Sequence, residues 1–302
     1  MAINPILMTH VNATQHASFG AATTYRAGGT ARVMLRINSI DELAAIAPVL
    51  AETRSITILG NGSNMLVSDK EFDGVVVVLG ASFEYLDIRP EADGEALVTL
   101  GGAIDLPVAA RRIVEAGLTG FEWAVGVPGT AGGATVMNAG GHGSDMAASV
   151  VSASIWRIDE CRAEEVAAKD LAFGYRNSSL GKRDIVLSVT LLLRTGDIDT
   201  SRAMLKEIVR WRRDNQPGGA NAGSVFQNPE GAKAGALIEQ CGLKGLRRGT
   251  AQVSEKHANF IQSDDGGSAS DVRDLIRHVH DEVLRLTGVD LHTEIRFVGF
   301  DE

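Results

Sequence analysis

The stretch FEWAVGVPGTAGGATVMNAGGHG, residues 121–143, decides how this chain folds. Seven glycines fall between Gly126 and Gly143, with Pro128 and Asn138 among them and almost no charge. Each glycine inside a helix or strand costs roughly 0.5–1 kcal/mol relative to alanine, so we expect neither an ordinary helix nor an ordinary strand here. Glycine permits a positive φ, and successive backbone N–H groups in such turns bind anions. The stretch predicts a loop around a phosphate-bearing cofactor; a glycine-rich connection between domains is the alternative.

A second polar turn of the same kind is Gly60-Asn61-Gly62-Ser63-Asn64, which lies between two apolar runs. Asparagine and serine beside glycine tolerate a left-handed backbone, and their short side chains can hydrogen-bond a diphosphate. The turn is not the Rossmann fingerprint, because Met65 stands where the third glycine belongs and no helical pattern follows. The sequence has no Walker A motif either. Two such loops, separated by a long segment, predict a cofactor clamped between two lobes.

The size and charge of the chain narrow its class. A length of 302 residues is long for one hydrophobic core, so we expect two or three domains. The formal net charge of −9 argues against a nucleic acid or a polyanionic surface as the partner. No apolar run approaches the roughly 18–20 residues that span a bilayer, and the N-terminus MAINPILMTHVN lacks the features of a signal peptide. Cys161 and Cys241 form no disulfide framework, so we expect a reduced, cytoplasmic protein without a membrane partner.

Helical and strand patterns are interleaved without a regular βαβ order, which predicts an α+β fold. Ser39-Ile40-Asp41-Glu42 is a capping box, and Asp105 is expected to cap the helix that ends at Gly117. A change in composition near Asp199 indicates a boundary between parts of the chain. The expected helices are 39–52, 105–117, 200–213, 232–240 and 271–286, and the expected strands are 56–59, 74–79, 96–100, 150–158, 185–193 and 294–300.

Three charged or hydroxyl residues stand in glycine-like or strand-like surroundings and are candidates for chemistry. Arg176 lies beside aromatic residues, Ser224 follows a glycine before a short apolar segment, and Glu294 lies in the last expected strand. Taken singly, each is also compatible with a solvated surface or turn residue. His278 and His280 are two positions apart on a helix and face different sides, so we expect no metal site there.

Taken together, these motifs resemble the UDP-N-acetylenolpyruvoylglucosamine reductase (MurB) family over nearly the whole chain. The segments that carry the resemblance are 24–29 (TYRAGG), 60–64 (GNGSN), 126–130 (GVPGT), 138–140 (NAG), 175–176 (YR), 223–229 (GSVFQNP), 253–260 (VSEKHANF) and 294–297 (EIRF). The resemblance implies a two-lobed FAD-binding fold of the vanillyl-alcohol oxidase type, with a third domain over the substrate. It implies a first FAD lobe over residues 1–80, a second over 81–199 and a substrate domain over 200–302.

The family's functional residues map onto this chain position by position. The implied catalytic residues are Arg176, Ser224 and Glu294. The implied FAD-binding residues are Gly60, Asn61, Gly62, Ser63, Asn64, Gly126, Pro128, Gly129, Thr130, Gly133, Asn138 and Gly140. The implied substrate-binding residues are Tyr175, Asn228, His257 and Asn259.

The resemblance also implies the reaction. FAD would be bound non-covalently, NADPH would give the hydride, and a UDP-sugar enolpyruvyl ether would be reduced for peptidoglycan synthesis by a monomeric enzyme. The sequence departs from the family at Gln227, where lysine is usual, and at Gly141-His142, where alanine-tyrosine is usual. The segment between Arg176 and Ser224 is short, as in the branch without a substrate-capping tyrosine loop. An FAD-dependent oxidase or dehydrogenase acting on an alcohol, and a flavin-binding module without turnover, are the alternatives.

Overall fold

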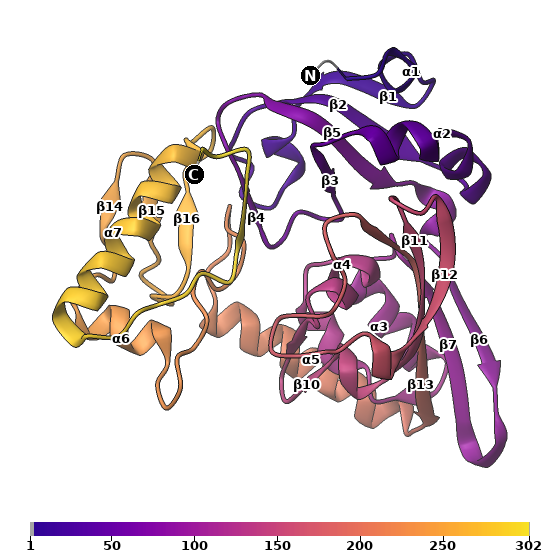
Figure 1. Ribbon diagram of the computed structural model, residues 1–302. Coiled ribbons are helices and arrows are strands. Elements are labelled where there is room, and N and C mark those ends of the chain that lie inside the picture. The colour runs from indigo at the N-terminus through magenta and orange to yellow at the C-terminus, as the bar shows by residue number, and fades with distance from the viewer. Residues whose placement is uncertain (1–2, 302) are drawn as a thin grey trace. The chain divides into compact units, whose positions relative to one another are not determined.

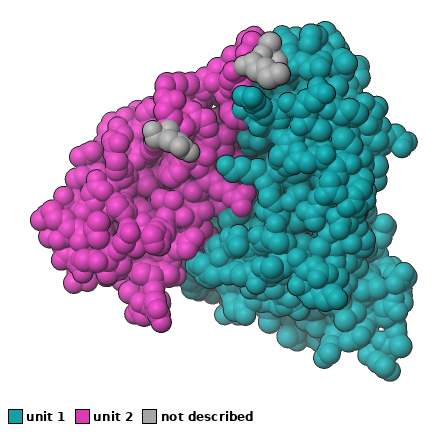
Figure 2. Space-filling view, in the orientation of Figure 1, with its two compact units in different colours: residues 1–15, 33–61, 74–212 teal, residues 16–32, 62–73, 213–302 magenta. Residues whose placement is uncertain are grey.

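The structure is a computed structural model that describes residues 3–301 and contains both helices and sheets, as an α+β fold requires (Figure 1). The chain forms two compact units, each made from separated segments (Figure 2). Unit 1 contains residues 33–61 and 74–212 with the N-terminal segment up to residue 15, and unit 2 contains residues 16–32, 62–73 and the chain from residue 213 onward. The units are therefore interleaved in sequence, whereas the expected division into 1–80, 81–199 and 200–302 is consecutive. That functional division stays a prediction.

The larger sheet of unit 1 is antiparallel, with the strand order β12-β11-β13-β7-β6 and the short strand β8 beside β13. From Val189 to Leu193 every second residue of β13 is buried, which gives this part of the sheet an apolar face. The helices α3 and α4 and the segment 121–126 pack onto the same core (Figure 1). The strands are β6 (Leu86–Pro90), β7 (Glu95–Gly101), β8 (Leu118–Thr119), β11 (Val150–Arg157), β12 (Arg162–Ala167) and β13 (Asp184–Thr195), and the helices are α3 (Leu106–Glu115), α4 (Ala131–Val136) and α5 (Ile198–Asn215).

A four-stranded sheet has the order β1-β2-β5-β3, with β3 and β5 parallel. Val75, Val76 and Val77 of β5 are fully buried, as the unbroken valine run predicts for an inner strand. The expected capping box also forms, because the Ser39 hydroxyl accepts the Glu42 N–H at 3.0 Å at the start of α2. The elements are α1 (Pro5–Met8), β1 (Ala13–Ala17), β2 (Ala31–Ile37), α2 (Ile40–Glu52), β3 (Ile56–Ile58) and β5 (Phe72–Leu79).

Unit 2 contains a three-stranded antiparallel sheet, a parallel strand pair and two helices. One face of α7 is buried in the core of this unit, and Gly288 ends the helix with φ +74°. The last expected strand, 294–300, is shortened to Arg296–Val298, because the Glu294 N–H pairs with Val225 and Gly299 turns the chain with φ +74°. The elements are β4 (Met65–Val67), α6 (Ala234–Gln240), β14 (Arg247–Arg248), β15 (Ala251–Val253), β16 (Ile261–Ser263), α7 (Ala269–Thr287) and β17 (Arg296–Val298).

The remaining regular elements are short. They are the hairpin strands β9 (Gly140–Gly141) and β10 (Ser144–Asp145) and the 3-10 helices η1 (Gly20–Ala22), η2 (Ala81–Phe83), η3 (Ala92–Gly94), η4 (Glu122–Gly126), η5 (Met146–Ala148) and η6 (Ala168–Asp170). Within residues 3–301, no helix is both long enough and apolar enough to cross a membrane.

Candidate active site

The two glycine-rich loops predicted from the sequence meet in unit 1. A Cβ atom on Gly60 would lie 2.5 Å from the hydroxyl oxygen of Thr130, so only glycine fits at this approach. The side-chain amide of Asn61 donates to the Asp105 carboxylate at 2.6 Å and to the Pro128 carbonyl at 3.3 Å. These contacts join two segments that are far apart in the sequence. They also correct the expected role of Asp105, whose carboxylate makes no cap hydrogen bond to α3 and holds Asn61 instead.

The glycine-rich stretch contains one short helix, contrary to the expectation that no helix would form there. Residues Ala131–Val136 form α4, and the hydroxyl of Thr130 accepts the Gly133 N–H at 3.2 Å as its N-cap. A Cβ atom on Gly132 would lie 2.9 Å from the Gly102 carbonyl oxygen. The close approach of the neighbouring backbone therefore requires a glycine and outweighs its cost in the helix.

The end of this stretch is a tight hairpin. Gly141 pairs with Ser144, and the two residues between them, His142 and Gly143, have φ angles of +52° and +88°. Positive φ at both positions is the type I′ geometry of two-residue hairpins. The His142 ring packs edge-to-face on Trp211 with the ring centroids 5.1 Å apart. Burial lowers the pKa of His142, and the nearby charge of Arg212 lowers it further.

Arg176 lies at the tip of a second tight turn in the same unit. Gly174 and Asn177 exchange two backbone hydrogen bonds of 3.0 and 3.3 Å, so Tyr175 and Arg176 are the central residues. Arg176 has φ +54°, a conformation that favours glycine and costs energy for other residues. Its Nη1 donates to the Gly140 carbonyl at 3.0 Å, and its guanidinium carbon lies 5.6 Å from the centre of the Tyr175 ring. Strain of this kind is concentrated at functional sites.

Asn138 joins this turn to the glycine-rich stretch. It has φ +40°, and its amide nitrogen donates to the Gly174 carbonyl at 2.9 Å. Its side-chain oxygen accepts the Ala147 N–H at 3.0 Å. Asn138 therefore connects the predicted cofactor loop with the turn that carries Arg176.

Ser224 and Glu294 lie on neighbouring segments of unit 2. Phe226 and Thr293 form an antiparallel bridge, flanked by hydrogen bonds from the Glu294 N–H to the Val225 carbonyl at 2.7 Å and from the Gln227 N–H to the His292 carbonyl at 2.9 Å. This register places Val225 opposite Glu294, with Ser224 one residue further along. The structure thus brings two of the three predicted catalytic residues together in unit 2, and the third, Arg176, belongs to unit 1.

Asn259 holds the Ser224 segment by its backbone. Its side-chain oxygen accepts the Phe226 N–H at 3.0 Å, and its side-chain nitrogen donates to the Phe226 carbonyl at 2.8 Å. Its own carbonyl accepts the Val225 N–H at 2.8 Å. Because Asn259 is buried and its amide serves this backbone, the structure gives it a role in positioning the Ser224 segment.

His257, three residues after Ser254, is half-buried beside α6. Its Nδ1 accepts the Asn259 N–H at 3.2 Å, which leaves the proton of the neutral ring on Nε2. Burial lowers the pKa of His257, so the ring is neutral at physiological pH.

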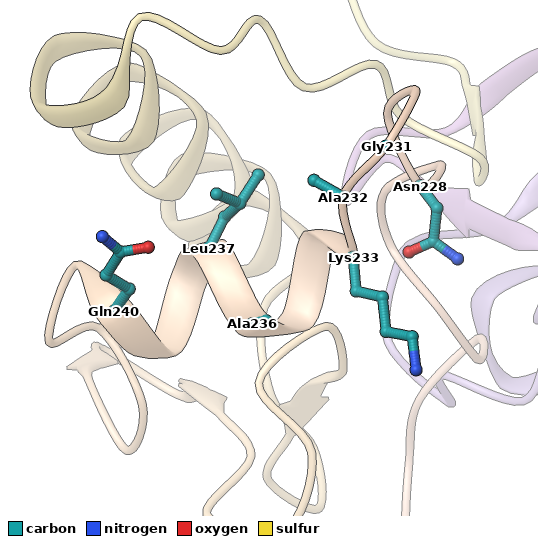
Figure 3. Close-up of a pocket in the computed structure, with 7 residues that line it drawn as sticks. All are labelled: Asn228, Gly231, Ala232, Lys233, Ala236, Leu237 and Gln240. Atoms are coloured by element: carbon teal, nitrogen blue, oxygen red, sulfur yellow. The ribbon is translucent and has the colours of Figure 1, made fainter.

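Asn228 lies at one end of an open groove of about 570 Å³ along α6, and Gln240 lies at the other end (Figure 3). Ala236 and Leu237 contribute apolar atoms to the lining of the groove, and Lys233, which immediately precedes α6, also lines it. The Asn228 side-chain oxygen accepts the Ala234 N–H at 3.0 Å, which leaves its amide hydrogens for another partner.

Comparison with known proteins identifies the family of this chain. Residues 215–298 match the family model of the UDP-N-acetylenolpyruvoylglucosamine reductase C-terminal domain, and residues 31–159 match that of an FAD binding domain. The chain is 40% identical over 279 residues to UDP-N-acetylenolpyruvoylglucosamine reductase of Paramagnetospirillum magneticum, covering 92% of this chain and 89% of the relative. The chain belongs to the MurB family.

Further relatives agree with this assignment. The reductase of Bacillus subtilis is 37% identical over 281 residues, covering 92% of this chain and 91% of the relative. The crystal structure of MurB from Thermus caldophilus superposes with a TM-score of 0.82 at 32% identity, covering 93% of this chain and 97% of that one. The predicted fold class, an FAD-binding fold followed by a C-terminal α+β part, is confirmed.

The residues of unit 1 fit an FAD cofactor. The indole N–H of Trp123, near the start of the glycine-rich stretch, is buried and has no hydrogen-bond partner among residues 3–301. A buried donor of this kind is suited to a bound polar group. A Cβ on Gly141 or Gly143 would meet no atom within 4 Å, so the hairpin tip leaves room beside the backbone. Within the described part of the chain, no group of three His, Cys, Asp or Glu side chains could hold a metal ion.

Glu122 is a buried carboxylate that is not among the predicted site residues. It accepts hydrogen bonds from the Thr119 hydroxyl at 2.7 Å, the Gly120 N–H at 2.8 Å and the Ser201 hydroxyl at 2.6 Å. These bonds fasten the start of the glycine-rich stretch to α5. An acidic residue inside the apolar run FEWAV is the signal that could have indicated it.

Proposed function

We propose that this chain catalyses the reduction of UDP-N-acetylglucosamine enolpyruvate to UDP-N-acetylmuramate, a step of peptidoglycan precursor synthesis, with FAD as cofactor and NADPH as hydride donor. The observation that carries this proposal is the paired arrangement of the Ser224 and Glu294 segments, in a chain whose Arg176 is bonded to the glycine-rich loop. The names of the relatives support the same reaction. We place the enzyme in the cytoplasm as a monomer.

FAD, when bound, supplies the hydride chemistry. We assign its phosphates and adjoining groups to the two loops that meet at Gly60 and Thr130, because their small residues let the backbone approach a ligand closely. The assigned residues are Gly60, Asn61, Gly62, Ser63, Asn64, Gly126, Pro128, Gly129, Thr130, Gly133, Asn138 and Gly140. Thr130 acts through its backbone in this assignment, since its hydroxyl caps α4.

Arg176 binds the carboxylate of the enolpyruvyl group. A guanidinium is always charged and holds a carboxylate through two parallel hydrogen bonds. Negative charge grows on this carboxylate when hydride reaches the neighbouring double bond, so a fixed cation stabilises the transition state. The strained turn and the bond to the Gly140 carbonyl restrict the directions that the Arg176 side chain can take.

Ser224 gives a proton to the carbon next to the carboxylate. The reduction adds one hydride and one proton across the double bond, and the proton needs a positioned donor. Ser224 follows Gly223, which has φ +75°, and precedes Val225, whose N–H and carbonyl are bonded to Asn259 and Glu294. The backbone around the hydroxyl is therefore fixed on both sides.

Glu294 acts in its neutral form as a hydrogen-bond donor to the developing enolate. A second ionised carboxyl beside the substrate carboxylate would be repelled, which favours protonation of Glu294 in the complex. Its segment is paired with that of Ser224, so the proton donor and the enolate donor act from neighbouring backbone positions.

The substrate nucleotide makes its polar contacts with Tyr175, Asn228, His257 and Asn259 in this proposal. Asn228 contributes its amide hydrogens, with the Lys233 ammonium nearby to meet an anionic group. Tyr175 is 61% exposed at its turn, so its ring is accessible to a ligand. Asn259 contributes to substrate binding by holding the backbone of the Ser224 segment at Phe226.

The test mixes the purified yellow protein first with NADPH and then with either the enolpyruvyl nucleotide or oxygen alone. Rapid return of the flavin absorbance with the nucleotide, and slow return with oxygen, is the expected result. Rapid reoxidation by oxygen without effect of the nucleotide would identify an oxidase instead. Acid precipitation of the same sample should release all of the flavin, because FAD is bound non-covalently; flavin that stays with the chain contradicts this part.

A further inference from the structure

Asn64, the last residue of the Gly60–Asn64 turn, is bonded to the backbone on both sides of Ile295. Its side-chain nitrogen donates to the Glu294 carbonyl at 3.2 Å, and its own carbonyl accepts the Arg296 N–H at 3.0 Å. Since a carbonyl only accepts hydrogen bonds, the amide of Asn64 must direct its NH₂ group toward Glu294. The family resemblance implies a cofactor role for Asn64, yet its side-chain amide donates a hydrogen bond within the protein.

The backbone of Glu294 is thereby held from two directions. Its N–H donates to the Val225 carbonyl at 2.7 Å, in the Ser224 segment, and its carbonyl accepts from Asn64. The contact with Asn64 continues directly into the parallel pair of β4 and β17, in which Met65 is opposite Arg296. The Ser224 segment and the glycine-rich turn thus meet at a single residue.

Residues 62–64, the part of this turn that belongs to unit 2, are tightly fitted in that unit. Gly62 has φ +59°, and a Cβ atom there would lie 2.7 Å from Cα of Thr23. The Gly62 carbonyl accepts the Thr24 N–H at 3.4 Å. A shift of this turn would therefore move the amide that fixes Glu294.

We propose that Asn64 is a positioning residue for the reaction: it fixes the backbone of Glu294 and links the placement of that glutamate to the seating of the cofactor turn. This inference rests on the proposed role of Glu294. Asn64 acts through Glu294, and its side-chain nitrogen touches no reacting atom. A displacement of about 1 Å in a catalytic group can cost about 10²-fold in rate.

The test is Asn64→Asp in the FAD-loaded enzyme. The carboxylate has the same shape as the amide but cannot donate, so it faces the Glu294 carbonyl as a second acceptor. We expect reoxidation of the reduced enzyme by the nucleotide to slow by about 10²-fold, and reduction by NADPH at saturating FAD to slow by a much smaller factor, because Asn64 also belongs to the turn assigned to FAD. The deficit should shrink as the pH falls, because the introduced carboxyl group, once protonated, again donates to the carbonyl.

The matched control is Gln252→Glu in the same unit. The Gln252 amide donates to the Gly245 carbonyl at 3.2 Å, the same distance and chemistry as at Asn64, but in strand β15 away from Glu294. We expect reoxidation of the reduced enzyme by the nucleotide, called the nucleotide step below, to keep its wild-type rate in this variant. A second readout is independent of turnover: hydrogen exchange of the amides in residues 294–298 should accelerate in Asn64→Asp and stay unchanged in Gln252→Glu.

Several outcomes overturn the proposal. The first is a wild-type rate of reoxidation by the nucleotide in Asn64→Asp. The second is a loss of this rate that excess FAD fully restores, and the third is a loss that does not depend on pH. The fourth is an unchanged rate of amide hydrogen exchange in residues 294–298. If Asn64→Asp does not fold, Asn64→Ser replaces it. The serine side chain is too short for its hydroxyl to reach the Glu294 carbonyl, so reoxidation by the nucleotide should be slowed and should not recover at low pH. Failure of the wild-type enzyme to react with the nucleotide rejects the proposed function, and the exchange measurement then decides whether Asn64 fixes the strand.

Discussion

Arg176 donates from Nη1 to the backbone carbonyl of Gly140 at 3.0 Å, so the guanidinium proposed to bind the substrate carboxylate is attached to the loop proposed to bind FAD. Both residues lie in hairpin-like turns that Asn138 connects through its bond to Gly174. The guanidinium proposed to bind the substrate is thus positioned by the same glycine-rich stretch that is proposed to bind FAD.

Arg176→Lys is expected to slow the nucleotide step by about 10²–10³-fold, the usual cost of losing a donor to developing charge. A lysine keeps the positive charge but cannot make two parallel bonds to a carboxylate. Reduction of the flavin by NADPH should remain near the wild-type rate in stopped-flow absorbance. Arg183→Lys is the control, because Arg183 also donates to backbone carbonyls of unit 1, at Thr53 and Ala51, 2.8 Å away in each case. Equal losses in both variants would contradict a substrate role for Arg176.

Ser224→Ala is expected to leave reduction by NADPH intact and to slow reoxidation by the nucleotide by about 10²–10⁴-fold, since only the second step needs the proton. Rapid mixing of pre-reduced enzyme with the nucleotide measures this step directly. Ser263→Ala, a serine in β16 of the same unit, is the control and should keep both rates. If both half-reactions of Ser224→Ala fall by the same factor, the serine has a structural role only.

Glu122→Gln is expected to destabilise the enzyme by about 1–3 kcal/mol at neutral pH, because the amide cannot satisfy all three donors that surround this buried carboxylate. Burial acts to raise the pKa of Glu122, but the hydrogen bonds from Ser201, Thr119 and the backbone outweigh it, and the pKa is lowered. Because the pKa of Glu122 is lower in the folded state, its ionised carboxylate stabilises the fold at pH values above the pKa of a glutamate in the unfolded chain, about 4.3. This stabilisation is lost as the pH falls through the pKa of Glu122 in the folded state.

Urea unfolding of the FAD-saturated enzyme at several pH values checks this prediction. The difference between wild type and Glu122→Gln should be constant near neutral pH and should narrow below about pH 4. Glu165→Gln, on the exposed side of β12, should change the unfolding free energy little at any pH. A difference that grows in acid would reverse the sign that the lowered pKa requires.

Local signals predicted much of the fold because they act within a few residues. The Ser39 cap of α2 and the buried valines of β5 appear as the sequence indicated, and α7 ends at Gly288, a glycine with positive φ. Packing between distant segments decided the rest. Helix α4 forms through glycines because the Gly102 backbone comes close, and β17 begins late because Glu294 pairs with Val225 first.

The candidate site shows the same division between local and distant effects. The motifs supplied the candidate residues, since glycine-rich turns and isolated polar residues are visible in the sequence, and the roles of these residues stay predictions. They could not show that Asn259 and Asn64 use their amides on the backbone of Phe226 and Glu294, because each partner is more than thirty residues away. Such contacts depend on the tertiary structure.

Glu294→Gln is expected to retain far more of the nucleotide step than Glu294→Ala. In a site closed to water, the substrate carboxylate and Glu294 share a single guanidinium in this proposal, so ionisation of both carboxyl groups is unfavourable. A neutral Glu294 donates one hydrogen bond to the enolate, and the glutamine amide also donates one. Alanine removes this donor and puts no other in its place.

The measurement is the rate of flavin reoxidation by the nucleotide in each pre-reduced variant. Glu294→Ala should lose about 10²–10³-fold, as for the removal of an oxyanion donor, and Glu294→Gln should lie close to wild type. An ionised Glu294 would instead orient Arg176 or a water molecule through its negative charge, and glutamine could not replace that charge. Equal losses in the two variants would therefore reject a neutral Glu294 and assign it the role of an anion. Alanine and glutamine both lack the negative charge, whereas only glutamine keeps a hydrogen-bond donor.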